Sequence, residues 1–209
     1  MKKTLRGFPR PAEKGGHPGE ECGVFGIYET SGPPDPAYFA YNGLLALQHR
    51  GQESCGIAVN DRGVISSHKG MGLVGEVFDH ESLGRLKGQM AVGHVRYSTS
   101  GASVRENAQP LVMQYMKGTL AIAHNGNLTN ACELYSLLAK QGCIFQTTID
   151  TEVVAYMIAR ERVNAPSIEE AVRRAMPKIH GAYSIVLMSP RKLLAVRDPH
   201  GFRPPCIGK

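Results

Sequence analysis

The stretch Glu20–Tyr28 reads EECGVFGIY, and ordered structure is predicted to begin within it. The residues before it, 1–21, are dominated by Lys, Arg, Gly and Pro and show no hydrophobic period, so we expect a leader. The residues from Cys22 to Tyr28 form an apolar run of the length of a buried strand. A cysteine therefore stands where the leader meets the first strand, and removal of the leader would give it a free α-amine.

Further along the chain, short predicted strands occur in hairpin-like pairs, and predicted helices are grouped between them. The expected strands are 56–60, 64–68, 91–97, 119–124, 182–188 and 192–196, and the expected helices are 37–48, 130–140, 151–162 and 167–179. Thr129 is expected to cap the second helix, and Ser167 with Glu170 forms a capping box for the last. A polar loop is expected over 98–110. This grouping favours an α+β fold over alternating βαβ units.

Composition and charge exclude several classes of protein. The 209 residues are 42% apolar, which suits a globular core, and no apolar run approaches the ~18 residues of a membrane span. The basic start lacks an apolar core and contains Glu13, Glu20 and Glu21, against a secretory signal or a transit peptide. The net charge of +6 is scattered and Trp is absent, against nucleic-acid binding. The five cysteines have no CxxC spacing, and free thiols suit the cytoplasm.

Two of the polar motifs suit nucleophilic catalysis through an oxyanion. If the leader is removed, Cys22 carries a thiol beside an α-amine that titrates near ~7.7–8 and can serve as its base. The alternative for Cys22 is a buried structural thiol. Asn125 and Gly126 follow a predicted strand, and a side-chain amide with the next N–H can form an oxyanion hole. The alternative for this pair is a hairpin turn.

Two other motifs suit a free amino acid as ligand, and a third is a cluster of polar residues. Arg96 offers a planar fork for a carboxylate, with the hydroxyl of Thr99 nearby, or else forms a strand-end salt bridge. Asp150 can accept an ammonium group or cap the helix that follows it. Arg50 lies beside Gly51 in a polar cluster, where the alternative is a cation at a helix C-terminus.

These residues occur in six ordered motifs that match a known family. The motifs are CGVFGI at Cys22, LQHRGQES at Leu47, GHVRYST at Gly93, AHNGNLTN at Ala123, TTIDTE at Thr147 and RDPHGFRP at Arg197. From about Glu20 to Lys209 the chain resembles the class II glutamine amidotransferase domain of amidophosphoribosyltransferases. The resemblance implies an N-terminal nucleophile hydrolase fold, a four-layer αββα sandwich with two antiparallel sheets.

The resemblance also implies a role for each candidate residue. A propeptide, 1–21, would be cleaved before Cys22, which would then attack the glutamine side-chain amide. Asn125 and Gly126 would hold the oxyanion, while Arg50 and Gly51 would place the nucleophile. The substrate carboxylate would bind Arg96 with Thr99 nearby, and its α-ammonium would bind Asp150.

In the whole enzyme of that family, ammonia passes to a phosphoribosyltransferase domain and converts phosphoribosyl pyrophosphate to phosphoribosylamine, the first step of purine synthesis. We expect residues 22–209 to form the glutaminase domain of a chain truncated before that second domain. No metal or cofactor is expected here; Mg²⁺ and, in some members, a 4Fe–4S cluster would be bound beyond Lys209. The full-length protein would form a dimer or tetramer. The alternatives are another class II amidotransferase, sugar-phosphate aminating or asparagine-forming, and an unprocessed, non-catalytic fragment.

Overall fold

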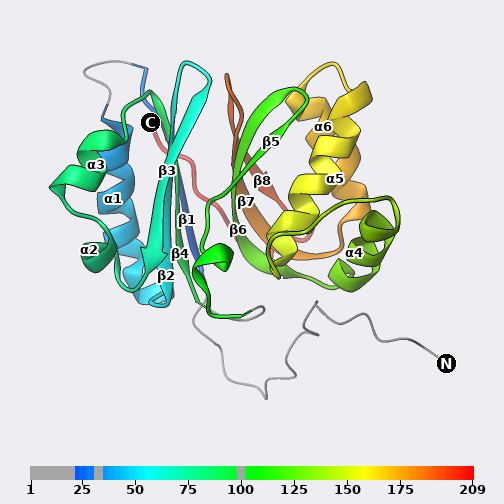
Figure 1. Ribbon diagram of the computed structural model, residues 1–209, viewed down its shortest axis with the longest axis horizontal. Helices are drawn as coiled ribbons and strands as arrows, with labels where there is room; N and C mark the ends of the chain where they lie inside the picture. Colours follow the sequence, from blue (N-terminus) through cyan, green and yellow to red (C-terminus); the bar gives the residue numbers. More distant parts are fainter. Residues whose placement is uncertain (1–21, 31–34, 98–101) are drawn as a thin grey trace.

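Two four-stranded antiparallel sheets lie face to face, and helices cover the outer side of each (Figure 1). The computed structural model describes residues 22–30, 35–97 and 102–209. The proposed leader, 1–21, and Thr99 lie outside the described residues. The predicted α+β fold, with four layers in the order αββα, is confirmed.

The first sheet carries the N-terminal half of the described chain in the order β1-β4-β2-β3. Its strands are β1 (Gly23–Tyr28), β2 (Ser54–Asp61), β3 (Val64–Met71) and β4 (Met90–Arg96). Helix α1 (Pro36–Leu47) begins with a proline and turns Ala37, Ala40 and Leu44 into the core. Helices α2 (Val74–Val77) and α3 (His80–Arg85) lie on the same side (Figure 1), and the short helix η1 (Gln48–Arg50) follows α1. Strand β4, between the helices and the second sheet, is buried throughout.

The second sheet has the order β5-β6-β7-β8, and the α-helices of the C-terminal half of the chain cover its outer side (Figure 1). Its strands are β5 (Leu111–Tyr115), β6 (Gly118–Leu128), β7 (Gly181–Met188) and β8 (Leu193–Arg197). These α-helices are α4 (Ala131–Lys140), α5 (Asp150–Asn164) and α6 (Ile168–Ala175). Two short 3-10 helices, η2 (Arg105–Asn107) before β5 and η3 (Met176–Lys178) after α6, also lie in this half of the chain. In the described part of the chain, no helix is both long and apolar enough to cross a membrane.

Small side chains allow the two sheets to approach closely. Ala58 and Val92 from the first sheet and Ala121 and Ala123 from the second belong to one buried cluster between them. At Gly26 on β1, an added Cβ would lie 2.6 Å from Val186 Cγ1 on β7. This close approach brings the ends of β1 and β4 toward β6, where the candidate site residues lie.

The structure corrects two local predictions. Strand β6 does not end at Asn125 but continues to Leu128, because Gly126 adopts φ 153° and pairs with Tyr183 on β7. Thr129 does not cap α4; its N–H donates to the carbonyl of His180 at 2.9 Å, so its backbone prolongs the strand pairing. The N-cap position of α4 falls on Asn130. Ser167 caps α6 as predicted, accepting a hydrogen bond from Glu170 N–H at 3.2 Å.

The last motif, RDPHGFRP, has a structural explanation within this fold. The Asp198 side chain is buried and accepts hydrogen bonds from the N–H groups of His200 at 2.8 Å and Gly201 at 2.7 Å. Its other oxygen accepts from Tyr183 N–H at 3.3 Å. The aspartate therefore organises the turn that follows β8 and fixes it to β7.

Candidate functional site

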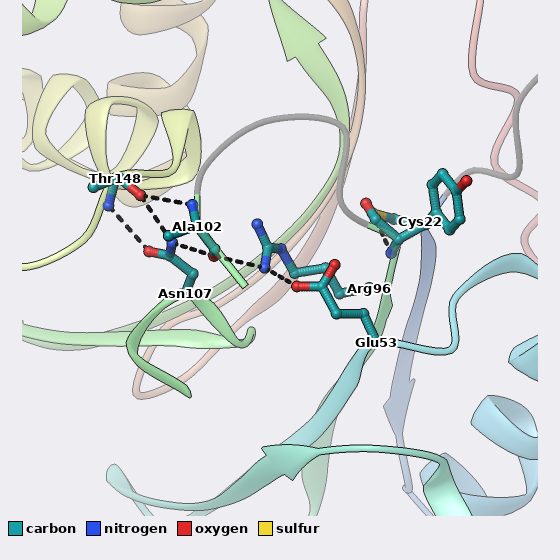
Figure 2. Close-up of polar contacts among 7 residues, drawn as sticks. Cys22, Glu53, Arg96, Ala102, Asn107 and Thr148 are labelled. Carbon is teal, nitrogen blue, oxygen red and sulfur yellow. Dashed lines mark hydrogen bonds and ion pairs between the residues drawn. The ribbon is translucent and has the colours of Figure 1, made fainter. Parts of the chain in front are cut away.

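Cys22 lies immediately before β1, with its thiol against the end of β4 (Figure 2). Its Sγ donates to the carbonyl of Tyr97 and accepts from Tyr97 N–H, both at 3.4 Å. Burial raises the pKa of this thiol, and the Tyr97 contact and the charge of Arg96 oppose that effect only in part. Cys22 is therefore held in place, but it needs a base to become a thiolate.

Arg50 and Gly51 are placed beside Cys22 by the end of η1. Arg50 Nε donates to the Cys22 carbonyl at 3.3 Å, which fixes the backbone next to the thiol. An added Cβ at Gly51 would lie 2.7 Å from the carbonyl carbons of Val95 and Arg96, so only glycine lets η1 pack on β4. The structure thus joins Arg50 to Cys22 and places Gly51 against the end of β4.

Arg96 ends β4 and is only 3% exposed. Its Nη1 donates to Glu53 Oε1 at 2.5 Å and to the carbonyl of Ala102 at 3.2 Å (Figure 2). The salt-bridge alternative is therefore present, with Glu53 as partner. A guanidinium has five N–H donors in a fork, so binding Glu53 is compatible with binding a second carboxylate.

Asp150 is the first residue of α5 and is buried against β6. It occupies the first helical position, so the N-cap alternative is not what the structure shows; Ile149 holds that position. One carboxylate oxygen accepts from Leu128 N–H at 3.0 Å, and the other lies 3.3 Å from His124 Nδ1. Burial opposes the charge, but His124 and these hydrogen bonds outweigh it and lower the pKa of Asp150. The carboxylate is thus ionised at neutral pH.

Asn125 and Gly126 follow His124 on β6. Asn125 is buried and lies opposite Ser184 on β7. An added Cβ at Gly126 would lie 2.0 Å from the carbonyl oxygen of Ala182, so this position accepts only glycine. The hairpin alternative for the pair is wrong, because the strand runs straight through it.

The charges of Arg96 and Asp150 both act on the Cys22 thiol, the first lowering its pKa and the second raising it. The candidate nucleophile thus feels both a cation that suits a carboxylate and an anion that suits an ammonium group. Three polar residues of this site were not singled out from the sequence: Glu53, Asn107 and His124. Glu53 and His124 lie inside quoted motifs, but their contacts join different motifs and leave no local signal.

No metal site is found in the part of the chain that the structure describes. Its His, Cys, Asp and Glu side chains do not form any group of three able to hold an ion. The five cysteines are all unpaired there.

The comparisons with known proteins agree on one family. A family model described as a glutamine amidotransferase domain matches residues 94–209. An amidophosphoribosyltransferase of Lacticaseibacillus casei is 46% identical over 190 residues, covering 90% of this chain and 95% of that one. The chain belongs to the glutamine amidotransferase domains of the amidophosphoribosyltransferase family. The family resemblance inferred from the motifs is confirmed.

A solved structure supports the fold of this amidotransferase domain. Glutamine phosphoribosylpyrophosphate amidotransferase from Bacillus subtilis, complexed with ADP and GMP, gives a TM-score of 0.77 at 41% identity, over 86% of this chain and 38% of that one. A relative from Arabidopsis thaliana named amidophosphoribosyltransferase 1, chloroplastic, is 48% identical over 92% of this chain. The chain spans 33% of the length of the Arabidopsis relative, and 40% and 41% of the amidophosphoribosyltransferases of Methanocaldococcus jannaschii and Synechocystis sp..

His94 makes this amidotransferase domain sensitive to acid. It is fully buried on β4, its Nε2–H donates to the His124 carbonyl at 3.1 Å, and its Nδ1 has no partner among the described residues. Burial lowers the pKa of His94 to about 3, whereas an unfolded chain protonates histidine near ~6.5. Between these values only the unfolded state binds the proton, so stability falls as the pH falls.

We expect urea unfolding to show this loss below pH ~6.5, with a slope approaching about 1.4 kcal/mol per pH unit. His94→Gln keeps a donor for the His124 carbonyl and cannot titrate, so its stability should depend less on pH. His49→Gln, at an exposed position, controls for the loss of one imidazole. Equal pH dependence in wild type and His94→Gln would show that His94 does not cause the effect.

Proposed function

We propose that this domain releases ammonia from glutamine through a thioester on Cys22. We propose further that the full-length protein uses the ammonia to convert phosphoribosyl pyrophosphate to phosphoribosylamine. The observation that carries the first part is that the Cys22 thiol is held on the backbone of Tyr97, next to Arg96, where the charges of Arg96 and Asp150 both act on it. The second part rests on the names of the relatives, which the chain matches over only part of their length.

Because burial raises the pKa of the Cys22 thiol, its attack needs a base, and we propose that this base is its own α-amine. Cleavage between Glu21 and Cys22 would expose that amine, whose pKa near ~7.7–8 makes it a base at neutral pH. The amine takes the thiol proton as Sγ attacks the amide carbon. The Asn125 side-chain amide and Gly126 N–H stabilise the negative oxygen of the tetrahedral intermediate. The resulting ammonium returns a proton to the leaving nitrogen, and ammonia departs.

Water completes the cycle on the same residues. The α-amine takes a proton from a water molecule as the water oxygen attacks the thioester carbon. The oxyanion forms again at Asn125 and Gly126, and the C–S bond breaks to release glutamate and the thiol. Each turnover therefore consumes one glutamine and one water and yields one glutamate and one ammonia.

The substrate's amino-acid end would be held by opposite charges. We infer that the α-carboxylate binds the Arg96 fork and that the α-ammonium binds Asp150, which stays ionised at neutral pH. Thr99, outside the described residues, follows Arg96 by three positions and would add a hydroxyl. The two clamps would point the side-chain amide toward Cys22.

The test is an assay of the purified protein for glutamate and ammonia from glutamine, repeated with phosphoribosyl pyrophosphate. We expect hydrolysis, and with phosphoribosyl pyrophosphate we expect glutamine-dependent release of pyrophosphate. Absence of glutamate formation by protein that begins at Cys22 would contradict the proposal. Hydrolysis coupled instead to amination of a sugar phosphate would retain the glutaminase and overturn the proposed acceptor.

Arg96→Lys should weaken glutamine binding more than it slows the chemistry. Lysine keeps the charge but loses the bidentate fork, a loss of about 1.5–3 kcal/mol for a charge-assisted bond. We expect KM for glutamine to rise about 10- to 100-fold, with kcat changed much less. Steady-state kinetics measures both, and Arg62→Lys at an exposed position is the matched control. An unchanged KM would exclude the proposed role of Arg96.

A further inference from the structure

Asn107 is a buried polar residue that the sequence analysis did not include among the candidate site residues. It ends η2 and is 1% exposed. Its Nδ2 donates to the Ala102 carbonyl and to Thr148 Oγ1, both at 2.8 Å, and its Oδ1 accepts from Thr148 N–H at 3.0 Å. Both ends of this amide therefore hold the backbone or side chain of a distant segment (Figure 2).

These bonds connect the two charged ends of the proposed substrate clamp. The Ala102 carbonyl that accepts from Asn107 also accepts from Arg96 Nη1 at 3.2 Å. On the other side, Thr148 lies two residues before Asp150, the first residue of α5. A continuous path of hydrogen bonds thus runs from Arg96 on the first sheet, through Ala102 and Asn107, to Thr148, two residues before the helix that begins at Asp150.

We propose that Asn107 is a positioning residue that sets Arg96 relative to Asp150 and so makes the site select an α-amino acid. This inference rests on the proposed function of the two charges. The α-carboxylate and α-ammonium groups of an amino acid sit on one carbon, so the groups that bind them must keep a fixed separation. Arg96 and Asp150 belong to different layers of the fold, and Asn107 joins those layers at this point.

Other contacts keep the surrounding segment in place without Asn107. Lys69 Nζ donates to the Ala108 carbonyl at 2.6 Å, and Gln109 Oε1 accepts from His124 N–H at 2.8 Å. These bonds tie residues 108–109 to β3 and to β6. Loss of the Asn107 amide should therefore loosen the link between Ala102 and Thr148 while the rest of the segment stays anchored.

The test compares glutamine with glutaramate, which has the same carboxylate and amide but lacks the α-ammonium group. For Asn107→Ala we expect KM for glutamine to rise about tenfold, as for one buried hydrogen-bonding group left without its partner, with kcat within about threefold. The preference in kcat/KM for glutamine over glutaramate should fall by a similar factor, because glutaramate does not use Asp150.

Thr148 provides matched variants that avoid the risk of misfolding. Thr148→Val has nearly the same shape but no hydroxyl, and it should reproduce the Asn107→Ala kinetics in part. Thr148→Ser keeps the hydroxyl and should leave KM for glutamine at the wild-type value. Because both residues belong to one network, Asn107→Ala combined with Thr148→Val should be less damaging than the sum of the two.

Two results would overturn the inference. The first is a folded Asn107→Ala variant with unchanged KM for glutamine and unchanged preference for glutamine over glutaramate. The second is a variant in which only kcat falls and the fall follows a lowered Tm. Either result requires that wild type hydrolyses glutamine with a preference over glutaramate. Failure of the wild type to do so counts against the proposed function instead, so the two failures are distinguishable.

Discussion

Replacing Cys22 by serine should abolish glutamine hydrolysis, with kcat reduced by at least about 10³-fold. Even with the thiol, burial raises the pKa, and the base proposed here is only an α-amine. A serine hydroxyl is far less acidic than a thiol, so the same amine cannot activate it. Glutamate production from glutamine, measured on protein whose N-terminus has been checked by mass, gives the rate.

Cys132→Ser is the matched control, since it changes an exposed thiol on α4 in the same way. We expect wild-type kinetics from it. Hydrolysis by Cys22→Ser at a rate near that of the control would exclude Cys22 as the nucleophile and with it the thioester mechanism.

Asn125→Ala should lower kcat for glutamine by about 10²–10³-fold, the usual cost of one oxyanion-hole donor. KM should change little, because the donor acts on the oxygen charge that develops in the transition state. Asn42→Ala controls for loss of an asparagine; its amide donates to the Tyr38 carbonyl on the exposed side of α1, at 3.0 Å. Full kcat in folded Asn125→Ala would remove this residue from the proposed oxyanion hole.

Much of the fold could be predicted because its periodic signals are local. The apolar run after Cys22, the hairpin of β2 and β3 and the capping serine of α6 all lie where the sequence places them. The short helices α2 and α3 and strand β5 were not predicted. Helices α2 and α3 are stabilised by packing on α1 and the first sheet, and β5 is stabilised by pairing with β6. A local sequence pattern does not reveal such contacts.

The site could be predicted only one motif at a time. Residue chemistry pointed to Cys22, Arg96 and Asp150 because a thiol, a fork and a carboxylate have few roles. The contacts around these residues join distant parts of the sequence. Glu53 binds Arg96 from 43 residues away, and Asn107 binds Thr148 from 41 residues away. Glu53 meets Arg96 only when β2 pairs with β4, and Asn107 meets Thr148 only when η2 lies against the segment before α5, so their roles follow from the structure.

The central claim is that Cys22 becomes an N-terminal nucleophile, and the most direct measurement is the intact mass of the purified protein followed by labelling with a thiol-reactive glutamine analogue. We predict a mass that begins at Cys22 and a single label, mapped to that residue by peptide sequencing, which excess glutamine prevents. A mass that begins at Met1, with Cys22 unlabelled, would contradict the account.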